Sequence, residues 1–387
     1  MLSADRPQTR LATRLSFLVA GFGLACWAPL VPYAKDRTGV EDGVLGLLLL
    51  CLGIGSIVAM IATGALAARY GSKPVILLGG FGLALILPTL AVADTAATLG
   101  LALFVFGAAL GTLDVAMNIH AVDVDRAAPE PLMSGFHALF SIGAFLGASV
   151  MTLLLSLHLS PFEATLLCVV PMGAAMVLVW PRLLTTVKTE DGPILAVPRG
   201  IVLLLAGLSA IAFLVEGAML DWGALLIRTE NLAPPAQAGL GYILFSIAMT
   251  TGRLLGDRVV ARIGDGATLL GGSLIAIGGF ALLLLSPFGS VALAGFVLIG
   301  LGASNLVPVL FRGAGTQTAM PVGLAVAAIT TMGYAGILVG PAGVGFVADS
   351  LGLKTAFWGL AGLVGIVALC ARAATSDARA LERRVAE

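Results

Sequence analysis

Charged side chains are scarce in this chain. Lys, Arg, Asp and Glu account for 11% of its 387 residues, whereas soluble domains carry about a quarter. The 21 basic and 21 acidic residues give a formal net charge of zero, which leaves none of the basic excess that proteins use to bind nucleic acid. The composition therefore excludes a soluble domain of ordinary make-up and predicts no nucleic-acid partner.

Cysteines and cofactor motifs are equally sparse. The four cysteines lie inside apolar segments without paired spacing, so we interpret them as packing residues rather than as disulfides or metal ligands. The sequence contains no H-E-x-x-H metal pair and no G-x-x-x-x-G-K-S/T phosphate loop. We expect no enzyme activity, no metal site and no cofactor.

Apolar residues dominate instead: they make up 59% of the chain, and the mean hydropathy is +1.06. Apolar segments of about 20 residues, the length that a helix needs to cross a bilayer, recur throughout the sequence. Runs such as LGLLLL and LLLLLS lack the alternation of barrel strands. We predict an all-α membrane protein with twelve transmembrane helices at 14–35, 44–68, 74–93, 97–121, 132–157, 162–181, 200–227, 236–261, 267–286, 289–311, 321–348 and 354–373.

The distribution of Lys and Arg predicts the orientation. If the N-terminus is cytoplasmic, sixteen basic residues fall on the cytoplasmic side and four outside, with Arg253 inside a span. We therefore expect a multi-pass protein of the inner (cytoplasmic) membrane with both termini in the cytoplasm. The longest internal polar stretch, 182–199, then forms a cytoplasmic linker.

An internal repeat divides the chain in two. A shift of 193 positions places Gly107 on Gly300 and Gly143 on Gly336 without gaps. The repeat predicts two pseudo-symmetric six-helix halves, an N-terminal bundle at 1–181 and a C-terminal bundle at 200–387 with a short cytoplasmic tail. Every third span is almost wholly apolar, whereas the others carry polar residues. Since polar groups in hydrocarbon face a protein interior or a watery cavity, we expect these other helices to line a central pathway.

The arrangement of six plus six helices resembles the major facilitator superfamily, and two loop motifs support the likeness. The segment GALAARYGSK at 64–73 resembles the family's signature between helices 2 and 3, except that Ala68 stands where an acid is expected. The resemblance implies gating roles for Gly64, Arg69 and Gly71.

The second half carries a related motif, GRLLGDRVVARIG at 252–264. Arg253 and Asp257 lie four residues apart and could pair on one helix face. We expect them to form a cytoplasmic gate together with Arg258 and Arg262.

Two further stretches, LDVAMN at 113–118 and FHALFSIGAFLGA at 136–148, are similar to helices 4 and 5 of the fucose:proton symporter branch. The likeness implies that Asp114 takes the proton and that His137 helps to bind a sugar. The acid that the symporter carries in helix 1 has no counterpart in GFGLACWAPLVPY at 21–33.

The residues themselves indicate similar roles. Asp114 interrupts an apolar run and shares a helix face with Asn118, four residues on, so it is suited to proton exchange in a cavity. A structural hydrogen bond between helices is the alternative. Glu216 is the second candidate for proton coupling, since it lies well inside its own span.

Substrate-binding candidates lie on the same set of spans. Asn118 and His137 come from the first half, and Asn305, Thr330 and Tyr334 from the second. Asp221 is a further candidate, although a charge near the outer interface is equally compatible with simple anchoring.

These features predict a secondary active transporter that moves a small, polar, sugar-like solute together with a proton by alternating access. Proton-coupled efflux of drugs or metabolites is the main alternative, although the aromatic content of 6% favours uptake. A membrane-embedded sensor is a minor alternative. The expected partners are the solute, protons and the lipid bilayer, and we expect a monomer.

Overall fold

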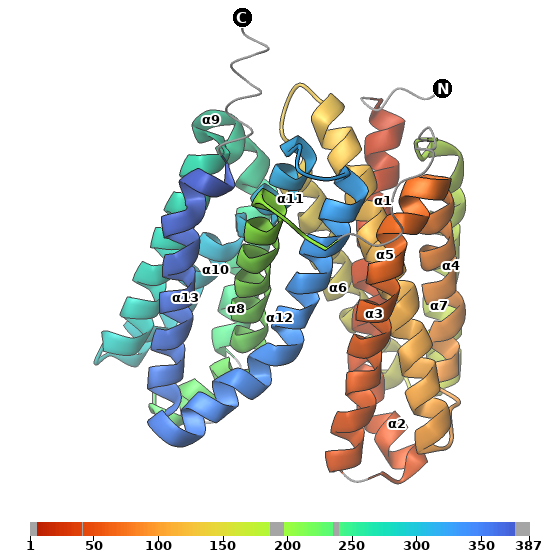
Figure 1. Cartoon of the computed structure of the whole chain (residues 1–387). Helices are drawn as coiled ribbons and strands as arrows, with labels where there is room; N and C mark the ends of the chain where they lie inside the picture. Colours follow the sequence, from red (N-terminus) through yellow and green to blue (C-terminus); the bar gives the residue numbers. More distant parts are fainter. Residues whose placement is uncertain (1–5, 41, 186–196, 235–239, 376–387) are drawn as a thin grey trace, which may run out of the picture. The chain divides into compact units, whose positions relative to one another are not determined.

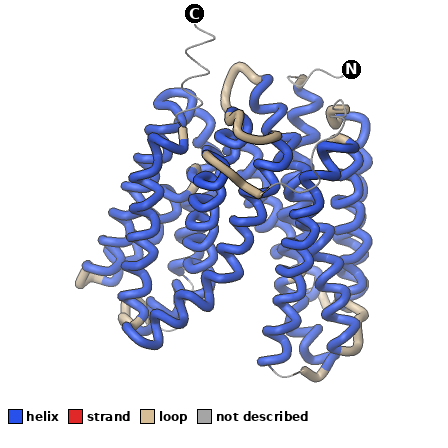
Figure 2. Tube along the Cα trace, viewed as in Figure 1, coloured by secondary structure: helices blue, strands red, loops and turns tan. Residues whose placement is uncertain are grey.

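The computed structural model describes residues 6–40, 42–185, 197–234 and 240–375, which form helices and loops without a strand (Figure 2). Contacts divide the chain into two compact units. The first unit comprises Met1–Pro129, Phe136–Val197 and Pro321–Ala327, and the second comprises Glu130–Gly135, Pro198–Met320 and Ala328–Glu387. Two short segments therefore differ from the predicted halves: Glu130–Gly135 belongs to the second unit, and Pro321–Ala327 belongs to the first. Most of the expected linker and the C-terminal tail lie outside the described residues.

Among the described residues up to 182, the chain forms seven α-helices and two 3-10 turns, and the helices run alongside one another (Figure 1). Their bounds are α1 (Pro7–Cys26), η1 (Ala28–Leu30), α2 (Val31–Thr38), α3 (Asp42–Tyr70), α4 (Ser72–Leu90), α5 (Ala96–Ala127), α6 (Met133–Ser156), α7 (Pro161–Val179) and η2 (Trp180–Arg182).

Six α-helices follow the linker in the described residues: α8 (Ile201–Thr229), α9 (Leu240–Leu285), α10 (Gly289–Ala303), α11 (Leu306–Thr316), α12 (Val322–Leu351) and α13 (Leu353–Ala374). At 46 residues, α9 would be about 69 Å long, more than twice the hydrocarbon thickness. Gly264, with φ 77° and ψ 166°, breaks it into two helices. The eleven candidate spans of the described residues therefore correspond to twelve membrane crossings, and the predicted fold class is confirmed.

Local sequence explains where several of these helices begin and end. Thr95 and Ser160 start α5 and α7 through capping boxes, in which the hydroxyl accepts the backbone N–H of the third helical residue. At the end of α4, the guanidinium of Arg37 donates to the carbonyl oxygens of Leu90 and Ala93 at 2.7 Å each. Carbonyl groups that no helical N–H can reach are thus satisfied.

The internal repeat is visible in the packing of both units. A Cβ atom on Gly107 of α5 would collide with the carbonyl oxygen of Leu52 on α3. A Cβ on Gly300 of α10 would collide with the carbonyl of Phe245 on α9, and both residues lie 193 positions further on. Helices approach this closely only where small residues face each other. The two units therefore repeat one packing scheme.

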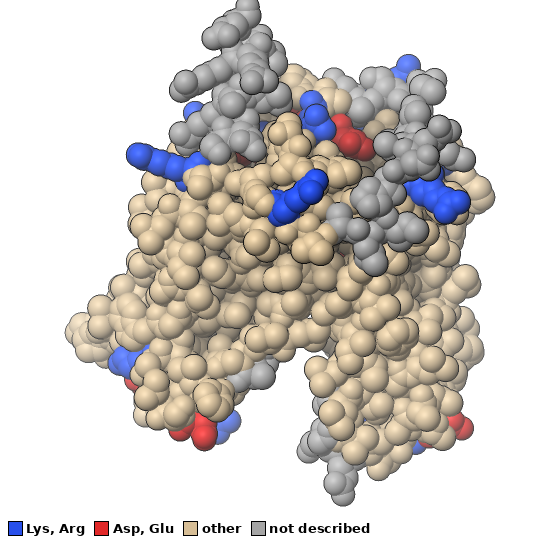
Figure 3. Space-filling view, in the orientation of Figure 1, with Lys and Arg blue, Asp and Glu red and all other residues tan. Residues whose placement is uncertain are grey.

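The surface is divided into polar ends and an apolar middle. Lys, Arg, Asp and Glu gather near the ends of the helices, and other residues cover the band between them (Figure 3). Large apolar side chains in this band are exposed, such as Leu85 at 70%, Phe145 at 72% and Leu369 at 85%. Exposed apolar surface on this scale suits contact with lipid rather than water. Polar side chains inside the units therefore need a functional or structural reason.

Candidate transport site

Asp114 lies about 27 Å along α5 from its start, at 1.5 Å per residue, and therefore close to the middle of the helix. The residue is 8% exposed, and Asn118 one turn later is 1% exposed. The amide Nδ2 of Asn118 donates to Asp114 Oδ1 at 3.0 Å and to the Asp114 carbonyl at 2.9 Å. The predicted sharing of one helix face is confirmed, and this amide holds the carboxylate in a fixed orientation.

His137 of α6 lies in an aromatic environment in the first unit. Its ring meets the edge of Phe17 of α1 with centroids 5.2 Å apart, and Phe17 in turn stacks on Phe136 at 5.9 Å. His137 is 9% exposed, whereas Phe17 and Phe136 are fully buried. The sequence singled out the histidine but not Phe17, because a phenylalanine in an apolar helix carries no distinguishing signal.

The second unit contains an ion pair between two spans. Nη2 of Arg253 on α9 lies 3.2 Å from Oε2 of Glu216 on α8. Nε of Arg253 donates to the backbone carbonyl of Ser304 at 3.3 Å. The Arg253 side chain is 7% exposed and that of Glu216 is 33% exposed. Burying a charged side chain inside a membrane span costs free energy unless the charge is paired. Each of these two side chains therefore compensates the charge of the other.

A short interruption between two helices lies beside this pair. The predicted span 289–311 falls within one candidate span, Gly289–Thr316, in which Ser304 and Asn305 separate α10 from α11. Asn305 Nδ2 donates to the carbonyl of Gly252 at 3.1 Å and to the hydroxyl of Ser304 at 2.9 Å. Its Oδ1 is buried without a hydrogen-bond partner. Interrupted helices expose backbone groups, and in transporters they mark binding sites.

Asp257 has two partners that its spacing within α9 does not suggest. Its carboxylate accepts the backbone N–H groups of Ser134 and Gly135, both at 2.9 Å, at the start of α6. These two residues belong to the same unit as Asp257. The N-terminus of a helix carries partial positive charge and unsatisfied N–H groups, which a carboxylate stabilises. A Cβ atom on Gly135 would approach Asp257 Oδ2 to 2.7 Å, so this position favours glycine.

The remaining substrate candidates occupy separate places in the second unit. Thr330 is fully buried in α12, and Tyr334 lies one turn on, where its ring packs against Phe213 of α8 at 6.1 Å. Asp221 is exposed. Tyr242 of α9, which the sequence did not single out for a role, lies one helical turn before Ser246 and within electrostatic reach of Glu216, Arg253 and Asp221.

The gate candidates of the first motif differ in their surroundings. Gly64 of α3 packs against Ala327 and Gly323, where a Cβ atom would approach that of Ala327 to 2.7 Å. Arg69 is exposed, with its guanidinium 5.5 Å from the ring of Tyr70. Gly71 has φ 82° and ψ 161°, a conformation almost confined to glycine.

In the second motif, Arg258 and Arg262 are exposed on α9. Gly264 has φ 77° and ψ 166°, nearly the conformation of Gly71, which lies 193 positions earlier. The two motifs therefore share a backbone turn as well as a sequence pattern, and the gating roles of their side chains stay predictions.

A buried histidine clamp was not foreseen from the sequence. His120 is fully buried, and its Nδ1 lies 3.1 Å from the hydroxyl of Thr13 on α1. Its Nε2 accepts the backbone N–H of Leu184 at 3.1 Å. Because Nε2 acts as an acceptor, the ring is the neutral tautomer that carries its hydrogen on Nδ1. His120 therefore ties the chain after η2 to α1 and α5.

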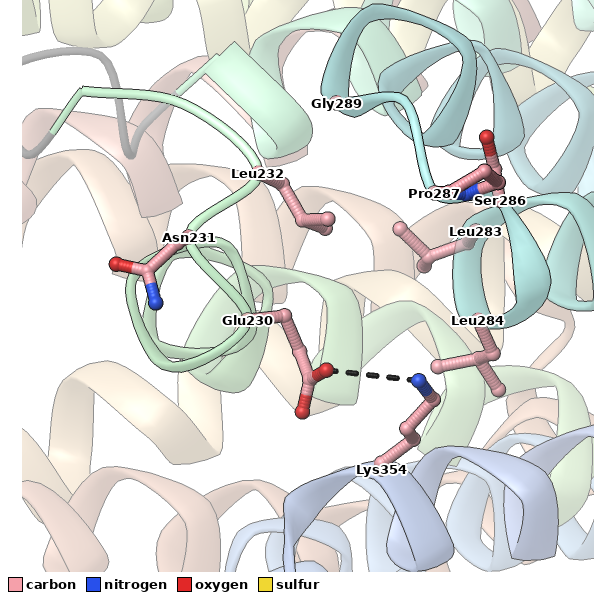
Figure 4. Close-up of a pocket in the computed structure, with 9 residues that line it drawn as sticks. All are labelled: Glu230, Asn231, Leu232, Leu283, Leu284, Ser286, Pro287, Gly289 and Lys354. Atoms are coloured by element: carbon pink, nitrogen blue, oxygen red, sulfur yellow. Dashed lines mark ion pairs between the residues drawn. The ribbon is translucent and has the colours of Figure 1, made fainter.

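A cavity of about 240 Å³ lies elsewhere in the second unit, among the ends of α8, α9 and α13 and the turn before α10 (Figure 4). Lys354 faces Glu230 there, with Nζ and Oε2 separated by 3.5 Å. Leu232, Leu283 and Leu284 form part of the lining. None of the predicted site residues lines this cavity, so it is distinct from the Arg253–Glu216 pair.

Comparison with known proteins identifies the family. The model of the Major Facilitator Superfamily matches residues 15–227. An uncharacterized MFS-type transporter of Yersinia pestis is 50% identical over 367 residues, which cover 95% of this chain and 96% of that protein. Membrane protein MosC of Rhizobium meliloti is 30% identical, covering 94% and 89%.

Solved structures agree on the fold. The fucose:proton symporter of E. coli superimposes with a TM-score of 0.74 at 18% sequence identity, over 96% of this chain and 99% of that one. At this identity the likeness concerns the fold alone. Together with the sequence relatives, it shows that the chain is a multi-pass membrane protein that belongs to the major facilitator superfamily, a family of transporters of small molecules and not of enzymes.

Proposed function

We propose that this transporter couples the movement of a small polar solute to a proton, by alternating access, in the inner membrane with both termini cytoplasmic. The observation that carries the proposal is Asp114, a carboxyl group 8% exposed near the middle of α5. Ionisable residues inside membrane spans are costly, and they commonly serve proton relays and substrate pathways. The solved fucose:proton symporter with the same fold supports a solute and proton mechanism without specifying it.

The geometry around Asp114 suits reversible protonation. Asn118 donates one hydrogen bond to Asp114 Oδ1, which stabilises the carboxylate. When the carboxyl group takes a proton, this bond can remain, since Oδ1 still accepts while the other oxygen carries the proton. Protonation removes a charge from the span and lowers the cost of burying the group. The loaded carrier can then change conformation, whereas the unprotonated carrier is held back.

Glu216 is the second proton acceptor in the proposal. Its carboxylate lies in the second unit, is one-third exposed and is paired with Arg253. Each unit thus supplies one proton acceptor, Asp114 in the first and Glu216 in the second. When Glu216 is ionised, its negative charge balances the positive charge of Arg253; when it is protonated, another anion has to do so. Asn118, His137, Asn305, Thr330 and Tyr334 are proposed as hydrogen-bonding groups for the solute.

The test is proton movement in proteoliposomes that contain a trapped pH dye. Sugars, sugar acids, amino acids and cationic drugs are added outside vesicles with wild type, Asp114→Asn or Asp123→Asn. Asp123 is a matched control, since it lies nine residues further along the same helix, towards its end. We expect one solute class to drive protons inward with wild type and Asp123→Asn, but not with Asp114→Asn.

Two results would contradict the proposal. Equal proton movement with Asp114→Asn and wild type would remove Asp114 from coupling. Protons that leave the vesicle when a solute enters would indicate exchange, which is the mechanism of an exporter.

A further inference from the structure

The cation in the middle of the second unit constrains the chemistry of the solute. Arg253 lies about 20 Å along α9 from its start, at 1.5 Å per residue, and its side chain is 7% exposed. A guanidinium remains charged at any physiological pH, unlike a lysine or histidine side chain. Its charge must therefore be compensated in every state of the transport cycle.

Two of the three nitrogens of Arg253 have unequal partners. Nε donates to the backbone carbonyl of Ser304, which lies between α10 and α11. Nη2 faces Glu216, whose side chain is 33% exposed and can change its charge. The first contact is fixed by the backbone, whereas the second is made by an accessible and titratable group. Nη2 is consequently the position at which another acceptor can enter.

We infer that the transported solute carries a carboxylate, which replaces Glu216 as the acceptor of Arg253 Nη2 when Glu216 takes up a proton. The inference rests on the proposed proton-coupled transport and specifies its substrate class. Protonation neutralises Glu216, and the incoming anion restores the lost negative charge. One proton and one carboxylate enter together, so the net charge around Arg253 is the same before and after binding. Arginine and carboxylate groups also match in geometry, because both are planar and can form two parallel hydrogen bonds.

The surrounding groups fit a polar anionic solute. The titratable and charged groups that face Glu216 are Arg253 and Tyr242 of α9, while Asp221 lies further along α8. Tyr242, Ser246 and Arg253 recur at helical spacing on one face of α9, so a solute held at Arg253 has hydroxyl groups within the same row. Tyr334 of α12 packs on Phe213, one turn before Glu216 on α8. These hydroxyl groups suit the polar body of a sugar acid or hydroxy acid.

Matched pairs of probes test the inference. Galactose and galacturonate, glucose and glucuronate, and glycerol and glycerate differ chiefly in one carboxylate. Apparent affinity is measured between pH 5 and 8 from dye-reported proton movement in proteoliposomes and, independently, from thermal stabilisation of the purified protein. The variants are Glu216→Gln and Arg253→Gln, with Arg228→Gln as the control because Arg228 is an exposed arginine in the last turn of α8, the helix that carries Glu216.

We expect the acid of at least one pair to bind at least tenfold more tightly than its neutral partner. Above the pH at which Glu216 ionises, the affinity of wild type for the acid should fall about tenfold per pH unit, since one proton is bound with the anion. With Glu216→Gln the pH dependence should weaken to the part that Asp114 contributes. Arg253→Gln should lose about thirtyfold or more in affinity for the acid, as for a truncated buried charge pair.

Each alternative outcome has a distinct meaning. If wild type binds the neutral member as well as the acid while protons still move, the carboxylate is not recognised, and the inference fails although the proposed function stands. If Glu216→Gln retains the pH dependence of wild type, Glu216 is not the exchanging group, and the inference again fails. If no solute of any pair moves protons or stabilises the protein, the inference fails, and the wider solute panel with Asp114→Asn decides separately whether the proposed function stands. The charge preference of wild type needs no variant, so a misfolded variant cannot mask the result.

Discussion

Substitution of two repeat-related glycines should destabilise both units in the same way. A Cβ atom on Gly107 or Gly300 would lie well within 3.0 Å of the carbonyl oxygen of Leu52 or Phe245, respectively. Helices α3 and α5, or α9 and α10, would have to separate by on the order of 1 Å to restore ordinary contact. Overpacking of this kind costs about 1–3 kcal/mol. Alanine recovers about 0.5–1 kcal/mol through its better helix propensity, which leaves a net loss of up to about 2.5 kcal/mol.

Alanine substitutions at two other glycines serve as controls, and they should stabilise the protein instead of destabilising it. A Cβ atom on Gly173 of α7 or Gly278 of α9 would meet nothing within 4 Å. Alanine at these two positions should therefore stabilise the protein by about 0.5–1 kcal/mol, because only the propensity contributes. Thermal unfolding of the detergent-solubilised protein, followed by tryptophan fluorescence, measures all four variants. The reasoning is refuted if Gly107→Ala and Gly173→Ala shift the midpoint in the same direction.

Three further substitutions test single contacts. Asp257→Ala should lose about 0.5–2 kcal/mol of stability by removing the acceptor at the start of α6, whereas Arg258→Ala should change the melting midpoint little; equal shifts would contradict the capping role. Gly71→Ala and Gly264→Ala should each cost about 1–3 kcal/mol, since their backbone conformation is nearly confined to glycine, and unchanged midpoints would refute this. His120→Phe should cost about 1–3 kcal/mol and speed protease cleavage after η2, because the N–H of Leu184 loses its acceptor; an unchanged cleavage rate would argue against the clamp.

Much of the fold could be predicted from the sequence, because a bilayer imposes a simple rule. Each crossing needs about 20 apolar residues, and this signal recurs twelve times along the chain. The repeat at 193 positions could also be recognised in the sequence, because glycines at helix contacts recur at a constant offset when two halves pack in the same way. The short interruption at Ser304 and Asn305, between α10 and α11, had no signal in the sequence, because the apolar run continues through both residues.

The partners of site residues were harder to predict. Asp114 and Asn118 are four residues apart, so their contact follows from helix geometry. The same spacing predicted a pair of Arg253 and Asp257, but it gave no indication of Glu216, which lies against Arg253 although it is 37 positions away in the sequence. Local spacing describes one helix only, and contacts between helices depend on how these are packed. For the same reason, the clamp formed by His120 had no signal in the sequence.

Proton coupling through Asp114 is the central claim, and a comparison of two transport modes tests it most directly. A solute that moves protons with wild type is followed in proteoliposomes with Asp114→Asn, both as accumulation under an imposed pH gradient and as exchange of labelled for unlabelled solute at equal pH. We predict that the variant retains exchange, because the solute still binds and the carrier still turns over, but loses accumulation against a gradient. Accumulation at the wild-type level would contradict the claim and show that the proton travels through another group.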